Sequence, residues 1–262
     1  MFNILQQPLG PAWAIALARA QTELTQLQPI NPTKLAAVAA WLLVEHVFHD
    51  LWLDGIKLSR ERVAELIIHQ AAPQGPEERL AVNYAQAVQW LHKLVTDETS
   101  RPESPVELTP ERLCHLHSLA VGQTDQAAGR FRAQPINPLY TGHEPAQPEE
   151  LPRLIELTLE WFAADSMSEL HPVEQAALVH LRLYELQPFG KASGRLTRLA
   201  ASLFTVRRAL PPIIISRERA DAYYQALLTG FQMATQPLVE LLAQSLGQTL
   251  RQMCAIIKND DT

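Results

Sequence analysis

The apolar residues of the chain recur at helical spacing along almost its whole length. They fall three or four positions apart, as on one face of an α-helix, with polar residues between them. Residues that favour a helix start, such as Asn31-Pro32, Ser59 and Thr109-Pro110, precede several of these segments. The pattern predicts helices over 11–26, 31–53, from 59, from 76 through 94, then a loop over 97–108, and helices over 109–121, 149–164, 172–186, 193–209, 217–231 and 236–258.

The segment 123–148 interrupts the helical pattern. It contains glycines and prolines at short intervals, and proline cannot donate a hydrogen bond within a sheet or a helix. We therefore expect a loop here, with at most a β-hairpin around residues 132–141. No fixed-period repeat or compositional break divides the chain. The pattern predicts a single all-α domain over residues 1–262, with helices within 11–97 and a last helix over 236–258.

Composition agrees with a helical globular protein and excludes several other classes. Of 262 residues, 47% are apolar and only 10 are glycine, which disfavours turn-rich sandwiches and barrels. The net charge of −6 predicts no affinity for nucleic acid or anionic membranes. Two cysteines exclude a disulfide scaffold. The longest apolar run, 35–44, is shorter than the roughly 20 residues of a membrane span, and no signal peptide is apparent, so we expect a cytoplasmic protein.

Two helices, 172–186 and 193–209, are apolar around most of their circumference. Such helices are expected to be central and buried. Residues 187–195 join them through a polar turn that contains glycines, and a turn held between two buried helices is rigidly placed, as a binding site requires. The alternative is an ordinary connection between two helices.

Positive charge is concentrated around this turn. Six basic residues and one acid, Glu185, lie between positions 179 and 208. Lys191, Arg195 and Arg198 fall at a predicted helix start, where free N–H groups and the helix dipole favour an anion. Arg195 and Arg198 are three positions apart and share a helix face. Paired guanidinium groups suit a phosphate, although solvated surface arginines are the simpler alternative.

The turn resembles the motif of the Fic family, His-Pro-Phe-x-Asp/Glu-Gly-Asn-Gly-Arg-x-x-Arg. Residues 187–198 read Gln-Pro-Phe-Gly-Lys-Ala-Ser-Gly-Arg-Leu-Thr-Arg. Other segments resemble the family outside the motif: Asn83-Tyr84, Gly129-Arg-Phe-Arg132, residues 135–140 and 145–150, and His171-Pro172. The resemblance spans about residues 40–230 and implies a Fic-like helical core at about 107–231 with a small β-hairpin flap.

The resemblance relates the chain to proteins that transfer AMP from ATP to a hydroxyl side chain of a target protein. In active Fic proteins the motif histidine is the general base, the acid binds Mg²⁺, and the motif arginines hold the phosphates of ATP. The flap binds the target protein, and the matching residues here are Ile136, Leu139 and Tyr140. The sequence does not name the target or the oligomeric state.

The segment around Asp54 and Gly55 resembles a worn form of the family's inhibitory motif. The inhibitory glutamate of the family pairs with the second motif arginine, which matches Arg198. Asp50 lies four positions before Asp54, where the family has serine or threonine. Because aspartate is one methylene shorter than glutamate, we expect Asp54 near Arg198 but do not expect a bidentate contact. The alternative role for Asp54 is an ordinary acid at a helix C-terminus.

The chain departs from the motif where the chemistry takes place. Gln187 stands at the base position and Lys191 at the metal-ligand position, so no residue is a confident catalytic candidate and neither Mg²⁺ nor another metal is expected. We predict that the chain binds ATP, another nucleotide or another phosphate compound without efficient AMP transfer. The predicted binding residues are Gly190, Lys191, Ala192, Ser193, Gly194, Arg195 and Arg198.

Two other functions remain open at this stage. One is an active AMP or phosphate transferase with altered, metal-independent chemistry, in which Lys191 replaces the charge of the metal. The other is a helical protein-interaction module without a ligand. The only other metal-compatible group, Cys114-His115-Leu-His117, is better explained by packing, since just Cys114 and His117 share a helix face.

Overall fold

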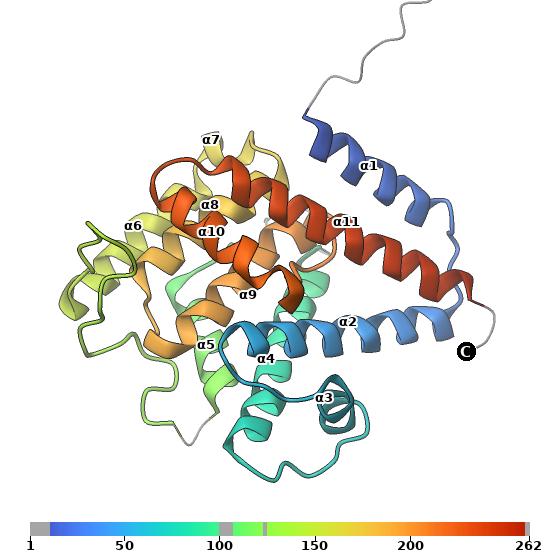
Figure 1. Ribbon diagram of the computed structural model, residues 1–262, viewed down its shortest axis with the longest axis horizontal. Helices are drawn as coiled ribbons and strands as arrows, with labels where there is room; N and C mark the ends of the chain where they lie inside the picture. The colour runs from blue at the N-terminus through green and yellow to red at the C-terminus, as the bar shows by residue number, and fades with distance from the viewer. Residues whose placement is uncertain (1–10, 100–106, 123–124, 260–262) are drawn as a thin grey trace, which may run out of the picture.

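The computed structural model describes residues 11–99, 107–122 and 125–259, and these residues form an all-α fold (Figure 1). The α-helices are α1 (Ala12–Thr25), α2 (Pro32–Leu53), α3 (Arg60–Ile67), α4 (Pro76–Thr99), α5 (Pro110–Val121), α6 (Leu151–Ala163), α7 (Asp165–Ser168), α8 (Pro172–Leu186), α9 (Ser193–Val206), α10 (Ala220–Phe231) and α11 (Gln236–Lys258). Three short 3₁₀ turns join them: η1 (Pro148–Glu150), η2 (Gly190–Ala192) and η3 (Arg217–Arg219). The all-α prediction is confirmed.

Side-chain caps start several helices at the predicted positions. The Asn31 side chain accepts a hydrogen bond from the Thr33 N–H at 2.8 Å. The hydroxyls of Ser59 and Thr109 accept from the N–H groups three residues later, at 3.1 and 3.2 Å. Each cap satisfies a backbone donor that the first helical turn would leave unpaired, which is typically worth about 1 kcal/mol.

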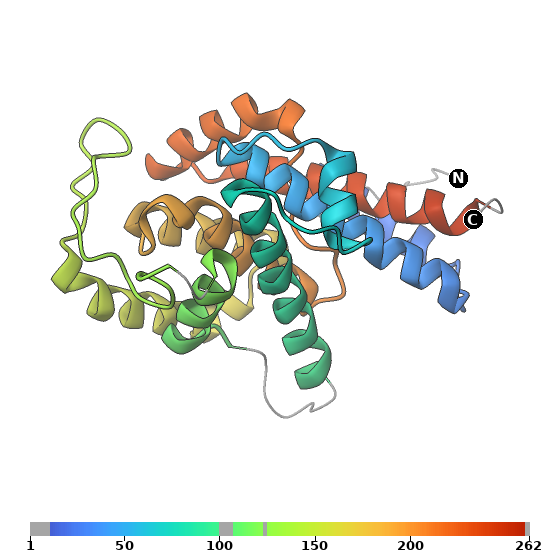
Figure 2. The same ribbon diagram turned by 90° about the horizontal axis from the view of Figure 1, so that it is seen from below.

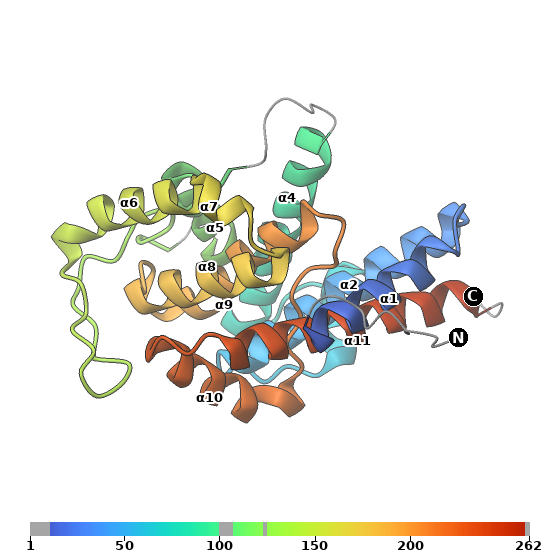
Figure 3. The ribbon, with the colours of Figure 1, turned by 90° about the horizontal axis from the view of Figure 1, so that it is seen from above.

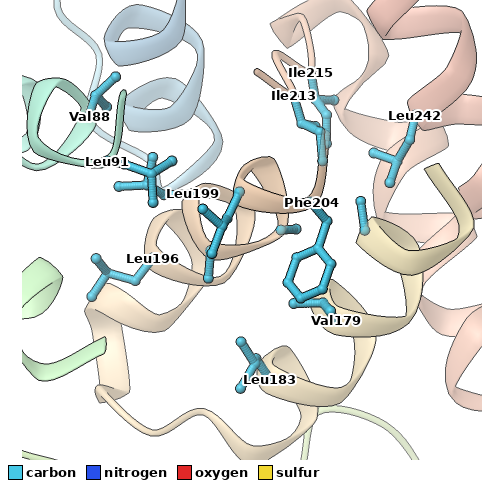
Figure 4. Close-up of a cluster of buried hydrophobic side chains, with 14 of the residues drawn as sticks. Val88, Leu91, Val179, Leu183, Leu196, Leu199, Phe204, Ile213, Ile215 and Leu242 are labelled. Carbon is cyan, nitrogen blue, oxygen red and sulfur yellow. The ribbon is translucent and has the colours of Figure 1, made fainter. Parts of the chain in front are cut away.

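The core is centred on α8 and α9, as their sequences predict. These two helices form the most extensive helix pair, and α9 is buried from Arg195 through Thr205. Figure 4 shows Phe204 of α9 beside Val179 of α8, with Leu199 of α9 and side chains of α4 and α11 in the same cluster. Burying one such side chain stabilises the fold by about 1.5–3 kcal/mol, so the turn between the two helices is firmly held.

α1, α2 and α11 form an arm beside this core (Figures 1 and 3). α1 packs along α11, and α11 also contacts α2 and α8. α2 is the one helix in the described part of the chain that is long and apolar enough to cross a membrane. Of that apolar window, 44% is buried inside the fold.

The predicted β-hairpin at 132–141 is wrong, since none of the described residues forms a strand. Residues 125–147 are an irregular loop that projects from one end of the molecule (Figures 2 and 3). The loop's N–H groups find other acceptors: Arg132 N–H donates to the Pro188 carbonyl at 2.7 Å, and Leu139 N–H donates to His143 Nδ1 at 3.0 Å. Two predicted helix ends also differ, because α4 continues to Thr99 and α9 ends at Val206.

Candidate functional site

The turn between α8 and α9 is built from two left-handed residues and a 3₁₀ turn. Gln187 caps α8 with φ 42° and ψ 58°, and Gly190 has φ 55°, a conformation in which glycine carries no steric cost. The hydroxyl of Ser193 accepts a hydrogen bond from the Phe189 N–H at 2.9 Å. Because the 3₁₀ turn η2 runs directly into α9, the Ser193 N–H bonds to the Gly190 carbonyl. The helix start therefore has fewer free N–H groups than the sequence suggested.

The two arginines of the turn lie side by side and share one carboxylate. Arg195 Nη1 donates to Asp54 Oδ2 and Arg198 Nη2 donates to Asp54 Oδ1, both at 2.8 Å. The carboxylate thus bridges the two guanidinium groups and makes one contact with each. All three side chains are at least nine-tenths buried, so water screens these charges little. The expected proximity of Asp54 and Arg198 is present in the structure.

Gly55 sets the position of Asp54 at the end of α2. Gly55 has φ 85°, its N–H bonds to the Trp52 carbonyl, and the Ile56 N–H bonds to the Leu51 carbonyl. This pattern is the Schellman motif, which ends a helix with a residue in the left-handed conformation. It leaves Asp54 as the cap residue of α2, with its side chain turned towards α9.

Asp50, one turn earlier on α2, holds Arg198 from the opposite side. Arg198 Nε donates to Asp50 Oδ1 at 2.7 Å, and Arg198 Nη2 donates to the Asp50 carbonyl at 3.0 Å. The Tyr84 hydroxyl donates to Asp50 Oδ2, and His46 Nε2 lies 3.4 Å from the same oxygen. Burial alone would raise the pKa of Asp50, but Arg198, His46 and Tyr84 hold it well below its usual range. Asp50 is therefore ionised at neutral pH although it is buried in the core.

Tyr223 and His180 complete the surroundings of Arg198. The Tyr223 hydroxyl lies 3.5 Å from Arg198 Nη1 and 2.7 Å from His180 Nε2. Burial lowers the pKa of His180 to about 3, with the Arg198 charge adding to the effect, so the imidazole is neutral at neutral pH. Burial would lower the pKa of Arg198, but Asp50 and Asp54 raise it well above its ordinary value. The guanidinium stays charged because two carboxylates balance it.

Arg132 joins the projecting loop to the turn, and the sequence analysis did not assign it a role. Its Nε donates to the Gln187 carbonyl at 3.0 Å, its Nη1 to the Gln134 carbonyl at 2.9 Å, and its Nη2 to the Ala146 carbonyl at 2.6 Å. The side chain is buried and bonds only to main-chain oxygens. It holds both legs of the loop against the end of α8. The position of Arg132 within the family-like segment 129–132 was the only signal for it.

The three predicted flap residues lie in this loop, and Tyr140 is anchored to the fold. The Tyr140 ring stacks on His143 and on Phe231 of α10 at 5.1 and 5.0 Å between centroids, and its hydroxyl donates to Glu185 Oε1 at 2.9 Å. Ile136 and Leu139 are half-buried. That these residues bind a protein target stays a prediction.

Lys191, Cys114 and His117 bear on whether the site could hold a metal ion. Lys191 is exposed on η2, at the position where the motif has an acid. Within the described ranges, no group of three or more histidine, cysteine or acidic side chains could hold a metal ion. The His117 ring packs against Phe189 of the turn in a tilted arrangement, at 4.4 Å between centroids, and burial lowers the pKa of His117 to about 4. His117 therefore packs against the site rather than opening onto it.

The comparison with family models identifies the part of the chain that carries this turn. Residues 107–205 match the model of the Fic/DOC family, and this range includes the whole segment 187–198. Residues 107–205 form a Fic/DOC domain. Asp50 and Asp54 lie outside the matched range, so the carboxylates that occupy the arginines of the Fic domain come from the preceding helices.

Relatives and solved structures extend the similarity beyond the Fic domain. The chain is 26% identical over 211 residues to the protein adenylyltransferase Fic of Drosophila erecta and to that of Drosophila willistoni. The alignment covers 79% of this chain, which spans 41% and 40% of the length of those relatives. Similar solved structures are a Fic domain containing signaling protein from Bacteroides thetaiotaomicron (TM-score 0.83, 21% identity, 94% of this chain and 99% of that one) and Fic-1 from C. elegans (TM-score 0.78, 21% identity, 94% and 73%). These structures establish the fold.

Proposed function

We propose that this chain binds a nucleotide or another phosphate-bearing ligand at residues 190–198 without efficient AMP transfer. The observation that carries the proposal is the pair of substitutions at the base and metal-ligand positions, Gln187 and Lys191. A carboxamide does not take up a proton near neutral pH, and an ammonium group repels Mg²⁺. Losing a general base alone typically costs about 10²–10⁴-fold in rate.

Among the described neighbours of Gln187, neither Glu185 nor His117 is placed to replace the base. Glu185 accepts from Tyr140 and pairs with Arg182 Nη1 at 3.0 Å, so both of its oxygens are engaged on the loop side. The His117 ring lies against Phe189, and its pKa of about 4 makes it a weak base. This arrangement supports ligand binding over adenylyl transfer.

Asp54 is the group that an incoming anion has to displace. Its carboxylate pairs with Nη1 of Arg195 and Nη2 of Arg198, and these two guanidinium groups are the ones best suited to bind a phosphate. A ligand can bind there only by competing with Asp54, so its affinity is expected to be modest in the native protein. In this proposal Asp54 and Gly55 form a regulatory segment, as in the family motif they resemble.

Labelling and titration together test the proposal. Incubation with ATP labelled at the α-phosphate and a cell lysate should leave both the chain and the lysate proteins unlabelled. Calorimetric titration with ATP, ADP and inorganic phosphate should show binding that weakens with salt, because screening reduces the attraction between charges, and that does not change with EDTA. Lys191→Ala gives a further test. Because Lys191 is exposed, this substitution should weaken ligand binding and leave the stability of the fold unchanged.

Each outcome has a definite meaning. Strong labelling by the native protein would support an active transferase with altered chemistry and refute the proposal. No heat and no thermal stabilisation with any of the three compounds at millimolar concentration would leave a helical interaction module as the explanation.

A further inference from the structure

Each of the two arginines gives one hydrogen bond to the Asp54 carboxylate, and among the described residues the buried Arg195 Nε has no hydrogen-bond partner. Arg198 uses Nε and one N–H of Nη2 on Asp50, and its Nη1 lies 3.5 Å from the Tyr223 hydroxyl. Only the second Nη2 N–H reaches Asp54, where it meets Oδ1. Arg195 contributes Nη1, which meets the other oxygen of the same carboxylate. Displacing Asp54 therefore frees one N–H on each arginine, which fits two oxygens of a single anionic group.

The charge balance of the site also favours a small anion. Asp50 is fully buried and pairs with Arg198, so one of the two arginine charges is already neutralised before a ligand arrives. The positive charge that remains comes from Arg195 and the exposed Lys191. A phosphomonoester carries about −1.5 to −2 at neutral pH, which matches these two cations without a metal.

A triphosphate fits this balance less well. It carries further negative charge on its inner phosphates, which Mg²⁺ neutralises in nucleotide sites. The acid that would hold such a metal is replaced by Lys191, and the described residues contain no group of three or more histidine, cysteine or acidic side chains that could hold a metal ion. The inner phosphates would thus lie beside two arginines, one of which is already neutralised by Asp50, and no metal would offset their negative charge.

From these two observations we infer that the site recognises a single phosphomonoester group, as in a nucleoside monophosphate or inorganic phosphate, in preference to a nucleoside triphosphate. The inference rests on the proposed function and specifies its ligand class. Asp50 is the residue that sets this preference, because it removes one positive charge from the pair while it keeps Arg198 in place.

The test uses Asp54→Ala, which removes the competing carboxylate, and compares ligands at matched ionic strength. Calorimetric titration of the native and variant proteins with inorganic phosphate, AMP and ATP, each with and without Mg²⁺, gives the order of affinities. The variant should bind phosphate and AMP at least about tenfold more tightly than the native chain, because two charge-assisted hydrogen bonds become available to the ligand. ATP should bind no more tightly than AMP, and Mg²⁺ should not help.

Two controls keep the outcomes separate. Asp54→Asn keeps the shape of the side chain and replaces Asp54→Ala if that variant unfolds. Arg195→Gln in the Asp54→Ala background should abolish the gain in phosphate affinity. If the Asp54→Ala variant binds ATP tenfold more tightly than AMP, the inference is wrong and the proposed function stands. If it binds neither phosphate, AMP nor ATP, the proposed function is itself wrong.

Discussion

Gly194 lies directly beneath the Asp54 carboxylate, and replacing it tests whether that carboxylate is held by the arginines. A Cβ at position 194 would stand 2.7 Å from Asp54 Oδ1 and 3.4 Å from Arg198 Nη1. The first separation is shorter than real contacts allow, so the carboxylate must move away. Gly194→Ala should therefore break the hydrogen bonds of Asp54 to Arg195 and Arg198 while all three of these residues stay unsubstituted.

The expected size of the effect follows from two opposing terms. In a helix, glycine to alanine stabilises by roughly 0.5–1 kcal/mol. Against this, the variant loses two charge-assisted hydrogen bonds of 2.8 Å, each worth about 1.5–3 kcal/mol, of which water restores a part. We expect a net destabilisation of about 2 kcal/mol in the native background. In an Asp54→Ala background the obstruction is absent, and the same substitution should stabilise by up to about 1 kcal/mol.

Urea unfolding of the four proteins measures this double-mutant cycle. The native chain, Gly194→Ala, Asp54→Ala and the double variant should give a coupling energy of about 2 kcal/mol or more between the two positions. Gly194→Ala should also raise phosphate affinity, since it displaces the same carboxylate. Equal effects of Gly194→Ala in the two backgrounds would show that the carboxylate is not held there, and the reasoning about the site would be refuted.

Three further predictions concern the hydrogen bonds of Arg132, the loss of stability at acid pH and the absence of AMP transfer. Arg132→Lys should destabilise the fold by about 2 kcal/mol, because an ammonium cannot span three carbonyl groups in a fork, and limited proteolysis should then cut within residues 133–146 more rapidly. The pKa of His180 is lowered to about 3, so the unfolded chain binds its proton more readily and stability should fall as the pH drops from about 6.5 towards 3. His180→Gln should flatten this acid limb by up to about 1.4 kcal/mol per pH unit in urea unfolding at several pH values, and an unchanged slope would contradict the assignment. Gln187→His alone should leave labelling by ATP absent, since the metal ligand is still missing, and a labelled product would refute that reasoning.

Local signals were strong enough to predict most helices of this chain. Asn31, Ser59 and Thr109 each cap a helix start by accepting a hydrogen bond from an N–H two or three residues later. Because such bonds depend on local sequence alone, the helix starts could be predicted. The apolar circumference of 172–186 and 193–209 likewise predicted their burial. The loop 125–147 was harder, because its N–H groups bond to Pro188 and to a side chain rather than to the opposite leg.

The site was only partly predictable. The resemblance brought Asp54 to Arg198 across 144 positions, which no periodicity could have done. The Asp50 contact was not expected, because the partner of an acid in the last turn of an apolar helix cannot be read from the local sequence. The same holds for Arg132, whose bonds all go to main-chain oxygens and leave no complementary residue to find in the sequence.

The hydrogen bonds of Arg132, here called the Arg132 clamp, divide the loop 125–147 into a base that is bonded to the fold and a tip that is not bonded to Arg132. This division is useful for engineering the protein. The clamp holds Gln134 on one leg and Ala146 on the other, so strain introduced between them stops at the clamp. Asn137 and Pro138 are exposed in that interval. An epitope tag or a small reporter domain inserted between them should leave the arginine turn undisturbed, which makes the loop a practical attachment point for immobilising the protein in binding assays.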